Sequence, residues 1–264
     1  IEKYGDTDIF PVPFEYNAIR DNWDNTIKPY LLSCDILKWN ARTHRRCLTP
    51  KHRYGFRIAT QLDPLDCIVF NTLIGEIGDE IENARLPKED KISFSYRFVK
   101  NENGDMFDEN YNFAGFQEHS LDLSDSLRFS HVVVADIADF YPRVYSHPLE
   151  NALENATSKS NHLTAIKSLL KNWNFTVSIG IPVGITATRL LAELVLDDVD
   201  RGLLSESTVH CRYVDDFRIF CTSLKEAHEK LALLANILYE NHGLTLQQNK
   251  TKILEIDNFK KIYL

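Results

Sequence analysis

An α+β fold, with an antiparallel sheet backed by helices, is predicted by three features of the sequence. A β-branched run at residues 131–137 leads into Asp136, which is typical of a buried strand that carries a carboxylate at its tip. Two short apolar runs flank Asp215 and Asp216 within residues 209–221, which predicts a hairpin. Helical patterns lie between these strands. The resulting order, β-α-α-α-β-β-α-β, suits helices layered on one face of an antiparallel sheet.

The other elements follow from start and stop signals and from apolar spacing. Asp63 and Pro64 start a helix, and Gly243 ends the last long one. Alternating residues at 92–99 predict a strand. We expect helices at residues 64–85, 148–156, 161–173, 186–204 and 224–241, and short strands near residues 244–246 and 253–256.

Composition is that of an ordinary globular protein. The 264 residues are 44% hydrophobic, enough for a sizeable core in one large domain or two closely packed ones. No apolar run approaches the ~18 residues that span a bilayer, so we expect no membrane segment. The five cysteines include no Cys-x-x-Cys pair, which favours a reducing cytoplasm. The first residue is Ile1, and we expect an internal fragment of a longer protein.

The net charge of −8 taken alone disfavours nucleic-acid binding, but the charges are unevenly distributed. No acidic residue lies between Asp35 and Asp63. This window contains seven cations and three aromatic residues able to stack on bases: Lys38, Arg42, Arg45, Arg46, Lys51, Arg53 and Arg57, with Trp39, Tyr54 and Phe56. The pattern predicts contacts with phosphates, and the alternative is a solvated surface loop.

Asp136, Asp215 and Asp216 each adjoin a strongly apolar strand, where a carboxylate is costly unless something compensates its charge. A salt bridge or exposure at a turn would be the ordinary compensation. For the adjacent pair Asp215 and Asp216 this explains less, because neighbouring acids repel each other unless cations sit beside them. A pair of Mg²⁺ ions would suit these oxygen ligands and would support phosphoryl-transfer chemistry.

Four motifs resemble those of reverse transcriptases and follow the order of that family. Residues 213–217, Tyr-Val-Asp-Asp-Phe, resemble the Tyr-x-Asp-Asp box. Residues 136–142 resemble the first palm motif, in which an aromatic residue follows the Asp by five positions. Residues 180–184, followed by 188–193, are similar to the template-contacting loop and helix, and residues 243–251 are similar to the segment whose Lys lies near pyrophosphate.

The resemblance implies a right-hand polymerase core. Fingers and the N-terminal region would occupy residues 1–120, and the palm, up to the start of the primer grip near residues 260–264, would occupy residues 121–264, with the thumb outside this chain. The implied reaction is Mg²⁺-dependent attack of a 3′-hydroxyl, or of a protein primer, on a deoxynucleoside triphosphate. Two alternatives remain open: an RNA-dependent RNA polymerase, which Tyr141 disfavours, and a catalytically silent scaffold that binds RNA or protein.

The resemblance also implies roles for the carboxylates and their neighbours. Asp136 and Asp215 would bind both Mg²⁺ ions, for which Mn²⁺ can substitute, and Ile137 would add its backbone carbonyl oxygen. Asp216 would complete the acidic cluster. Lys250 would act as a general acid toward pyrophosphate, and the alternative is an ordinary surface lysine.

Other residues would hold the nucleotide. Arg57, at the start of a segment that resembles the finger motif, would bind the triphosphate, and Lys51 and Arg53 would add phosphate contacts. Tyr141 would exclude a ribose 2′-hydroxyl and so favour deoxynucleotides; the alternative is a core aromatic residue. Val183 lies in the nucleotide-binding loop, where retron and group II intron enzymes usually carry Gln.

Residues 95–97 and 189–193 resemble one branch more closely, the bacterial abortive-infection and unknown-group reverse transcriptases of phage defence. This branch implies a bacterial cytoplasmic protein that binds an RNA template or a noncoding RNA and makes DNA. A homo-oligomer or a partner protein is a further expectation. Because Val183 stands in place of Gln, templated and untemplated synthesis both remain open.

Overall fold

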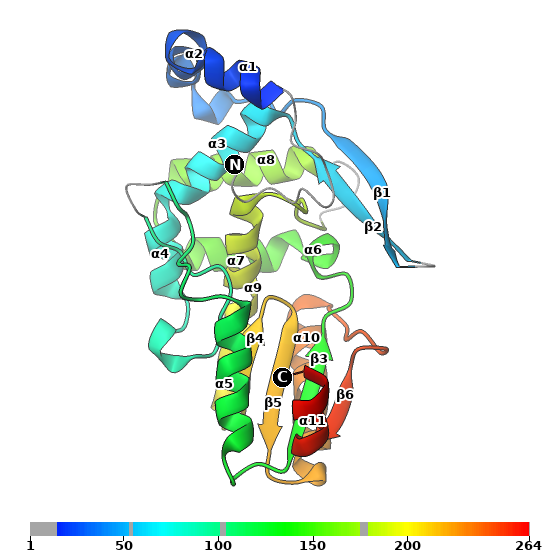
Figure 1. The fold of residues 1–264 in the computed structure, drawn as a ribbon. Helices are drawn as coiled ribbons and strands as arrows, with labels where there is room; N and C mark the ends of the chain where they lie inside the picture. The colour runs from blue at the N-terminus through cyan, green and yellow to red at the C-terminus, as the bar shows by residue number, and fades with distance from the viewer. Residues whose placement is uncertain (1–14, 53–54, 101–103, 175–178, 264) are drawn as a thin grey trace.

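A four-stranded antiparallel sheet forms the centre of the lower half of the molecule (Figure 1). The computed structural model describes residues 15–52, 55–100, 104–174 and 179–263, without the side chains of residues 51 and 52. The strands are, in spatial order, β4 (Val209–Tyr213), β5 (Asp216–Cys221), β3 (His131–Asp136) and β6 (Lys252–Glu255). The predicted antiparallel α+β arrangement and the hairpin at residues 209–221 are confirmed.

One face of this sheet packs on two long helices. These are α9 (Thr186–Ser205) and α10 (Leu224–His242), both of which contact strands of the sheet. Val133 and Ala135 of β3, with Phe217 and Ile219 of β5, are fully buried in the larger core. These four residues share a face because opposite residues of an antiparallel pair point the same way. The β-branched run therefore forms a buried strand, as its sequence predicts.

The other face of the sheet is also covered, so the expectation of helices on one face only was incomplete. Two helices that the sequence patterns did not reveal, α5 (Phe113–Asp125) and α11 (Ile256–Tyr263), lie across it (Figure 1). Val132 and Val134 pack there in a second core with Phe116 and Phe259. The segment expected to start a primer-grip hairpin thus lies, up to residue 263, in a helix.

The upper half of the molecule in Figure 1 is helical and carries one two-stranded hairpin. Its elements are α1 (Glu15–Asp21), α2 (Lys28–Ser33), β1 (Arg45–His52), β2 (Gly55–Gln61), α3 (Pro64–Glu76), α4 (Gly78–Ala84), α6 (Phe140–Arg143), α7 (Ser146–Ala156) and α8 (Ser160–Trp173), with short turns of helix at Trp23–Ile27 and Ile36–Lys38. A third short turn, Lys88–Asp90, follows α4. Trp173 packs edge-on against Phe70, which joins α8 to α3. Among the described residues, no helix is long and apolar enough to cross a membrane.

Three predicted elements differ from the structure. The helix expected at residues 64–85 is interrupted at Ile77, whose φ of −108° separates α3 from α4. The strand expected at residues 92–99 does not form, because Tyr96 has a left-handed φ of 47° that interrupts an extended chain. The strand expected near residues 244–246 is reduced to a bridge. Isolated bridges join Ser93 to Arg212, Phe98 to Phe107 and Leu246 to Ile137.

Gly243 ends α10 and starts the segment that leads to residue 250. Its φ of +61° is strained for any other residue, and a Cβ there would lie 2.8 Å from Cε2 of Tyr145. We predict that Gly243→Ala lowers the free energy of unfolding by about 1–2 kcal/mol. Gly75, near the end of α3, has open space around its Cα. Gly75→Ala, the matched control, should raise the free energy of unfolding by about 0.5–1 kcal/mol. Urea denaturation measures both, and equal losses would contradict the prediction.

Candidate active site

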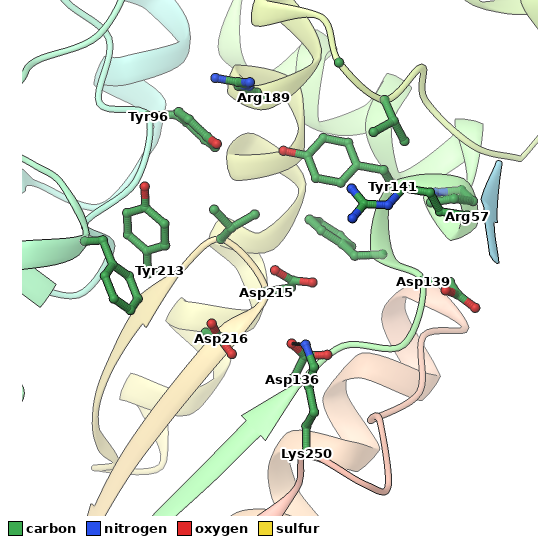
Figure 2. A pocket seen from close by; sticks show the side chains of 16 residues that line it. Arg57, Tyr96, Asp136, Asp139, Tyr141, Arg189, Tyr213, Asp215, Asp216 and Lys250 are labelled. Atoms are coloured by element: carbon green, nitrogen blue, oxygen red, sulfur yellow. Dashed lines mark hydrogen bonds and ion pairs between the residues drawn. The ribbon is translucent and has the colours of Figure 1, made fainter. Parts of the chain in front are cut away.

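A pocket of about 390 Å³ opens at the end of the sheet, where β3 meets the β4–β5 hairpin (Figure 2). Seven of the predicted site residues line it: Arg57, Asp136, Tyr141, Val183, Asp215, Asp216 and Lys250. Ile137 follows Asp136 and is buried. Arg53 and the side chain of Lys51 lie outside the part of the chain that the structure describes. The fold therefore gathers residues that are widely separated in the sequence.

The register of the sheet sets the spacing of the three carboxylates. Asp136, the last residue of β3, lies directly opposite Asp216, the first residue of β5. Asp215 occupies the turn between β4 and β5. Its carbonyl oxygen accepts a 3.3 Å hydrogen bond from the amide of Ile137, which ties the turn to the end of β3. Two buried strands thus present three acids at one edge of the sheet.

Electrostatics at this edge are unfavourable for three ionised acids. Burial raises the pKa of Asp215 to about 7, and repulsion from Asp136 and Asp216 adds to the effect. Burial, followed by repulsion from Asp136, also raises the pKa of Asp216. Asp215 and Asp216 therefore bind protons more tightly than free aspartate does. A cation placed among them would relieve the same strain.

Lys250 supplies part of that positive charge. Its ammonium donates a 2.6 Å hydrogen bond to Oδ2 of Asp136 (Figure 2). Burial alone would lower the pKa of Lys250, but the contact with Asp136 outweighs it and leaves the pKa above its ordinary value. The amide of Gln247 also donates to the carbonyl oxygen of Asp136, at 2.7 Å, which fixes the turn that carries Lys250. Lys250 is thereby held at the carboxylates.

The donor set fits a hard divalent cation in its chemistry, because it consists of carboxylate oxygens that lie close together at one edge of the sheet. As the side chains stand, no three His, Cys, Asp or Glu residues within the described ranges converge tightly enough to hold a metal ion. One oxygen of Asp136 is already bonded to Lys250. Metal binding would require the carboxylates to turn toward one another, and Oδ2 of Asp136 would join them if Lys250 released it. Asp136, Asp215 and Asp216 are the residues that would hold the ion.

Tyr141 forms the wall across the pocket from Asp136 (Figure 2). It lies on α6, half-buried, with its ring edge-on to Phe140 at 5.5 Å between centres. Burial raises the pKa of the Tyr141 phenol well above its ordinary value, so the hydroxyl stays protonated at neutral pH. The ring lines the pocket and also packs against the core, and its role in excluding a ribose 2′-hydroxyl stays a prediction.

The loop that carries Val183 is fastened to α6. The amide of Ile181 donates to the carbonyl oxygen of Tyr141 at 2.9 Å, and the amide of Gly180 donates to that of Val144 at 2.7 Å. Gly180 has a φ of +94°, and a Cβ there would lie 3.0 Å from the Pro142 carbonyl oxygen. Glycine is therefore required for this close approach. These contacts hold the start of the loop that brings Val183 to the pocket lining.

Arg57 reaches the pocket from the β1–β2 hairpin. Its neighbours along β2, Phe56 and Ile58, are 61% and 51% exposed, and successive residues of a strand point to opposite faces. Arg57 therefore points inward. Figure 2 shows its guanidinium beside Tyr141, across the pocket from Lys250. A triphosphate between these two cations would meet positive charge at both ends.

A group of buried polar residues meets behind the pocket. Ser95 and Glu193 belong to the motifs at residues 95–97 and 189–193, but the sequence suggested no structural role for them. Glu193 of α9 is fully buried and accepts hydrogen bonds from Arg85, Ser93, Ser95 and Arg212. A signal was available, because Glu193 interrupts an apolar helix face and a buried charge requires partners. Arg189 lies with its guanidinium 5.2 Å from the ring centre of Tyr96.

The fold is that of a known protein family. A family model described as reverse transcriptase (RNA-dependent DNA polymerase) matches residues 89–261, well over half of the chain. The chain belongs to the reverse transcriptase family. The matched segment contains all three carboxylates and Lys250. No curated protein matches the sequence.

Solved telomerase structures share the fold of this reverse transcriptase domain. Apo telomerase from Candida tropicalis gives a TM-score of 0.56 at 12% identity, over 91% of this chain and 49% of that chain. Telomerase from Candida albicans, in complex with the TWJ fragment of telomeric RNA, gives 0.58 at 13%, over 83% and 42%. A Candida tropicalis telomerase truncated from its C-terminal domain gives 0.58 at 14%, over 91% and 55%. This chain spans about half of those chains, and the likeness confirms the predicted polymerase fold class.

Stability of the domain should depend on the ionisation of Asp215. Because its pKa is raised to about 7 in the folded state, ionisation destabilises the fold as pH rises from about 4 through 7. We predict that Asp215→Asn, with EDTA present, raises Tm relative to wild type by roughly 2–4 °C at pH 8. At pH 5 the gain should be much smaller, because wild-type Asp215 is then protonated. Calorimetry at the two pH values checks this, and a gain independent of pH would contradict it.

Proposed function

We propose that this reverse transcriptase domain transfers nucleotides from deoxynucleoside triphosphates to a 3′-hydroxyl, or to a protein primer, with Mg²⁺ as cofactor. The observation that carries the proposal is one pocket in which Asp136, Asp215 and Asp216 face Arg57 and Tyr141. A nucleotidyltransferase requires acids that bind metal cations, a cationic side chain that binds phosphate and a surface against which the sugar packs. The family match supports the same reaction.

Each residue has a role in this proposal. Two divalent ions bound by Asp136 and Asp215, with the Ile137 carbonyl, would activate the attacking hydroxyl and offset charge on the departing pyrophosphate. Arg57 would bind the triphosphate through paired N–H donors. Lys250, which donates to Asp136 in this structure, would turn to the pyrophosphate and donate its proton there. The fingers would comprise residues 1–120 and the palm residues 121–264.

The finer assignment rests on motif resemblance. Residues 95–97 and 189–193 support a place among bacterial defence-associated reverse transcriptases, and therefore a cytoplasmic protein that uses an RNA template or binds a noncoding RNA. Mn²⁺ would substitute for Mg²⁺, and a homo-oligomer or partner protein would complete the enzyme. The exposed ring of Phe56 on β2, beside the cationic stretch before it, supports single-stranded nucleic acid as the ligand of the hairpin.

We predict that Asp136→Asn abolishes nucleotide incorporation, with a loss of at least about 1,000-fold, because a neutral amide cannot replace a shared metal ligand. Asp139→Asn is the matched control: it lines the same pocket, and Asn tolerates its left-handed φ of 49°, so most activity should remain. Labelled deoxynucleotide incorporation measures both. An Asp136→Asn variant as active as wild type would contradict the mechanism. A folded wild-type protein that binds RNA but incorporates nothing would favour the scaffold alternative.

Sugar selection should depend on the ring of Tyr141. We predict that Tyr141→Ala raises ribonucleotide use relative to deoxynucleotide use by about 10- to 100-fold, because a ring packed edge-on against Phe140 blocks a 2′-hydroxyl. Tyr141→Phe should retain the wild-type preference, since the ring rather than the hydroxyl excludes the ribose. Competition between the two nucleotide types, scored on all three proteins, tests this. The same preference in Tyr141→Ala and wild type would make Tyr141 a core residue only.

A further inference from the structure

We infer that Ser95 and Arg212, oriented by Glu193, form a clamp that holds the Asp215–Asp216 turn in its working shape. The inference deepens the proposed function and rests on it for its catalytic consequence. None of these three residues lines the pocket, so each is a positioning residue that acts through the backbone of Val214. Arg212 precedes the turn on β4, whereas Ser95 and Glu193 come from distant parts of the chain.

The turn needs an external restraint because Val214 is strained. Its φ is 56°, in the left-handed region that a β-branched side chain rarely adopts. Asn or Gly would occupy this conformation at lower cost. A residue held in such a conformation persists only when surrounding contacts enforce it, and such residues concentrate at functional sites. Asp215 follows Val214 directly, so the direction of its carboxylate depends on this backbone.

Both polar backbone groups of Val214 are held by side chains. Its amide donates a 2.8 Å hydrogen bond to Oγ of Ser95. Its carbonyl oxygen accepts a 2.8 Å hydrogen bond from Nη1 of Arg212. Ser95 and Arg212 are 1% and 0% exposed, so water does not compete for either contact. Rotation of Val214 to an ordinary φ would break both bonds in a buried setting.

Glu193 gives the clamp its direction. Its Oε1 accepts a 2.6 Å hydrogen bond from the Ser95 hydroxyl, so the hydroxyl proton is committed to Glu193 and a lone pair remains for the Val214 amide. Its Oε2 accepts a 3.0 Å hydrogen bond from Nη1 of Arg212, the same nitrogen that holds the Val214 carbonyl. One carboxylate therefore orients both Ser95 and Arg212, the two side chains that hold Val214.

The rest of the network keeps Arg212 and Glu193 in place. Asp200 accepts from Nε and Nη2 of Arg212, with a shortest distance of 2.7 Å, which fixes the guanidinium plane. Arg85 donates to Oε2 of Glu193 at 3.0 Å and balances the second negative charge. Buried ion networks contribute little net stability compared with apolar packing. Their use behind a strained turn is therefore better explained by the geometry they impose.

The test combines the removal of one clamp contact with relief of the backbone strain at Val214. Ser95→Ala should lower kcat about 10-fold with little change in nucleotide KM, because the carboxylates lose their position while the nucleotide pocket remains. Adding Val214→Gly to Ser95→Ala should restore most of the lost kcat, since glycine adopts a positive φ without restraint. Ser207 has a φ of 55° and is exposed, away from the pocket, so Ser207→Gly is the control that should not restore it.

A second readout needs neither metal nor nucleotide. Amide hydrogen exchange across residues 213–217 should be faster in Ser95→Ala than in wild type, because the Val214 amide loses its partner. Glu193→Gln should act in the same direction on exchange and kcat, and Val214→Gly should offset its effect on kcat. If wild type incorporates nothing yet exchange rises in both variants, the proposed function fails and the clamp stands. Unchanged exchange in Ser95→Ala would overturn the clamp, and so would a rescue of kcat by Ser207→Gly equal to that by Val214→Gly. If Glu193→Gln does not fold, the comparison of Ser95→Ala with and without Val214→Gly still tests the clamp.

Discussion

Mutual repulsion among three acids at the end of the sheet is the constraint on which the rest of the structure depends. Asp136 and Asp216 lie opposite each other across two strands, with Asp215 beside them, and burial removes much of the water that would screen their charges. Such a group does not assemble unaided, so the surrounding fold must supply the free energy. The raised pKa of Asp215 reflects this free-energy cost of burying the acids side by side.

Packing on both faces of the sheet supplies much of the holding force. Val133 and Ala135 point into the larger core and Val132 and Val134 into the smaller one, so β3 cannot slip by one residue without exchanging both sets. Register fixed in this way places Asp136 at the edge regardless of its charge. The polar network around Glu193 then adds what apolar packing cannot, a defined backbone conformation at Val214.

Sequence patterns predicted the parts of this arrangement that depend on local chemistry. Three features could be predicted because neighbouring residues determine them: the β-branched strand that ends at Asp136, the hairpin at Asp215 and the end of the helix at Gly243. The strand expected at residues 92–99 fails for a non-local reason: Arg85 donates to the carbonyl oxygens of Ser95 and Tyr96 and helps to hold a bent chain. Partners far apart in sequence, such as Glu193 and Ser95, leave no periodicity from which to predict them.

The pocket also has consequences for how a base would be selected. The side chain of Val183 offers no hydrogen-bonding group to a base, and the start of its loop is held near α6 by backbone hydrogen bonds. Discrimination on this side would then come from shape, through Val183 and the ring of Tyr141. Shape excludes a sugar hydroxyl well, but a wall of this kind holds a paired base less firmly than an amide would. Under the proposed function, this wall would select the sugar by shape and would leave both templated and untemplated synthesis open.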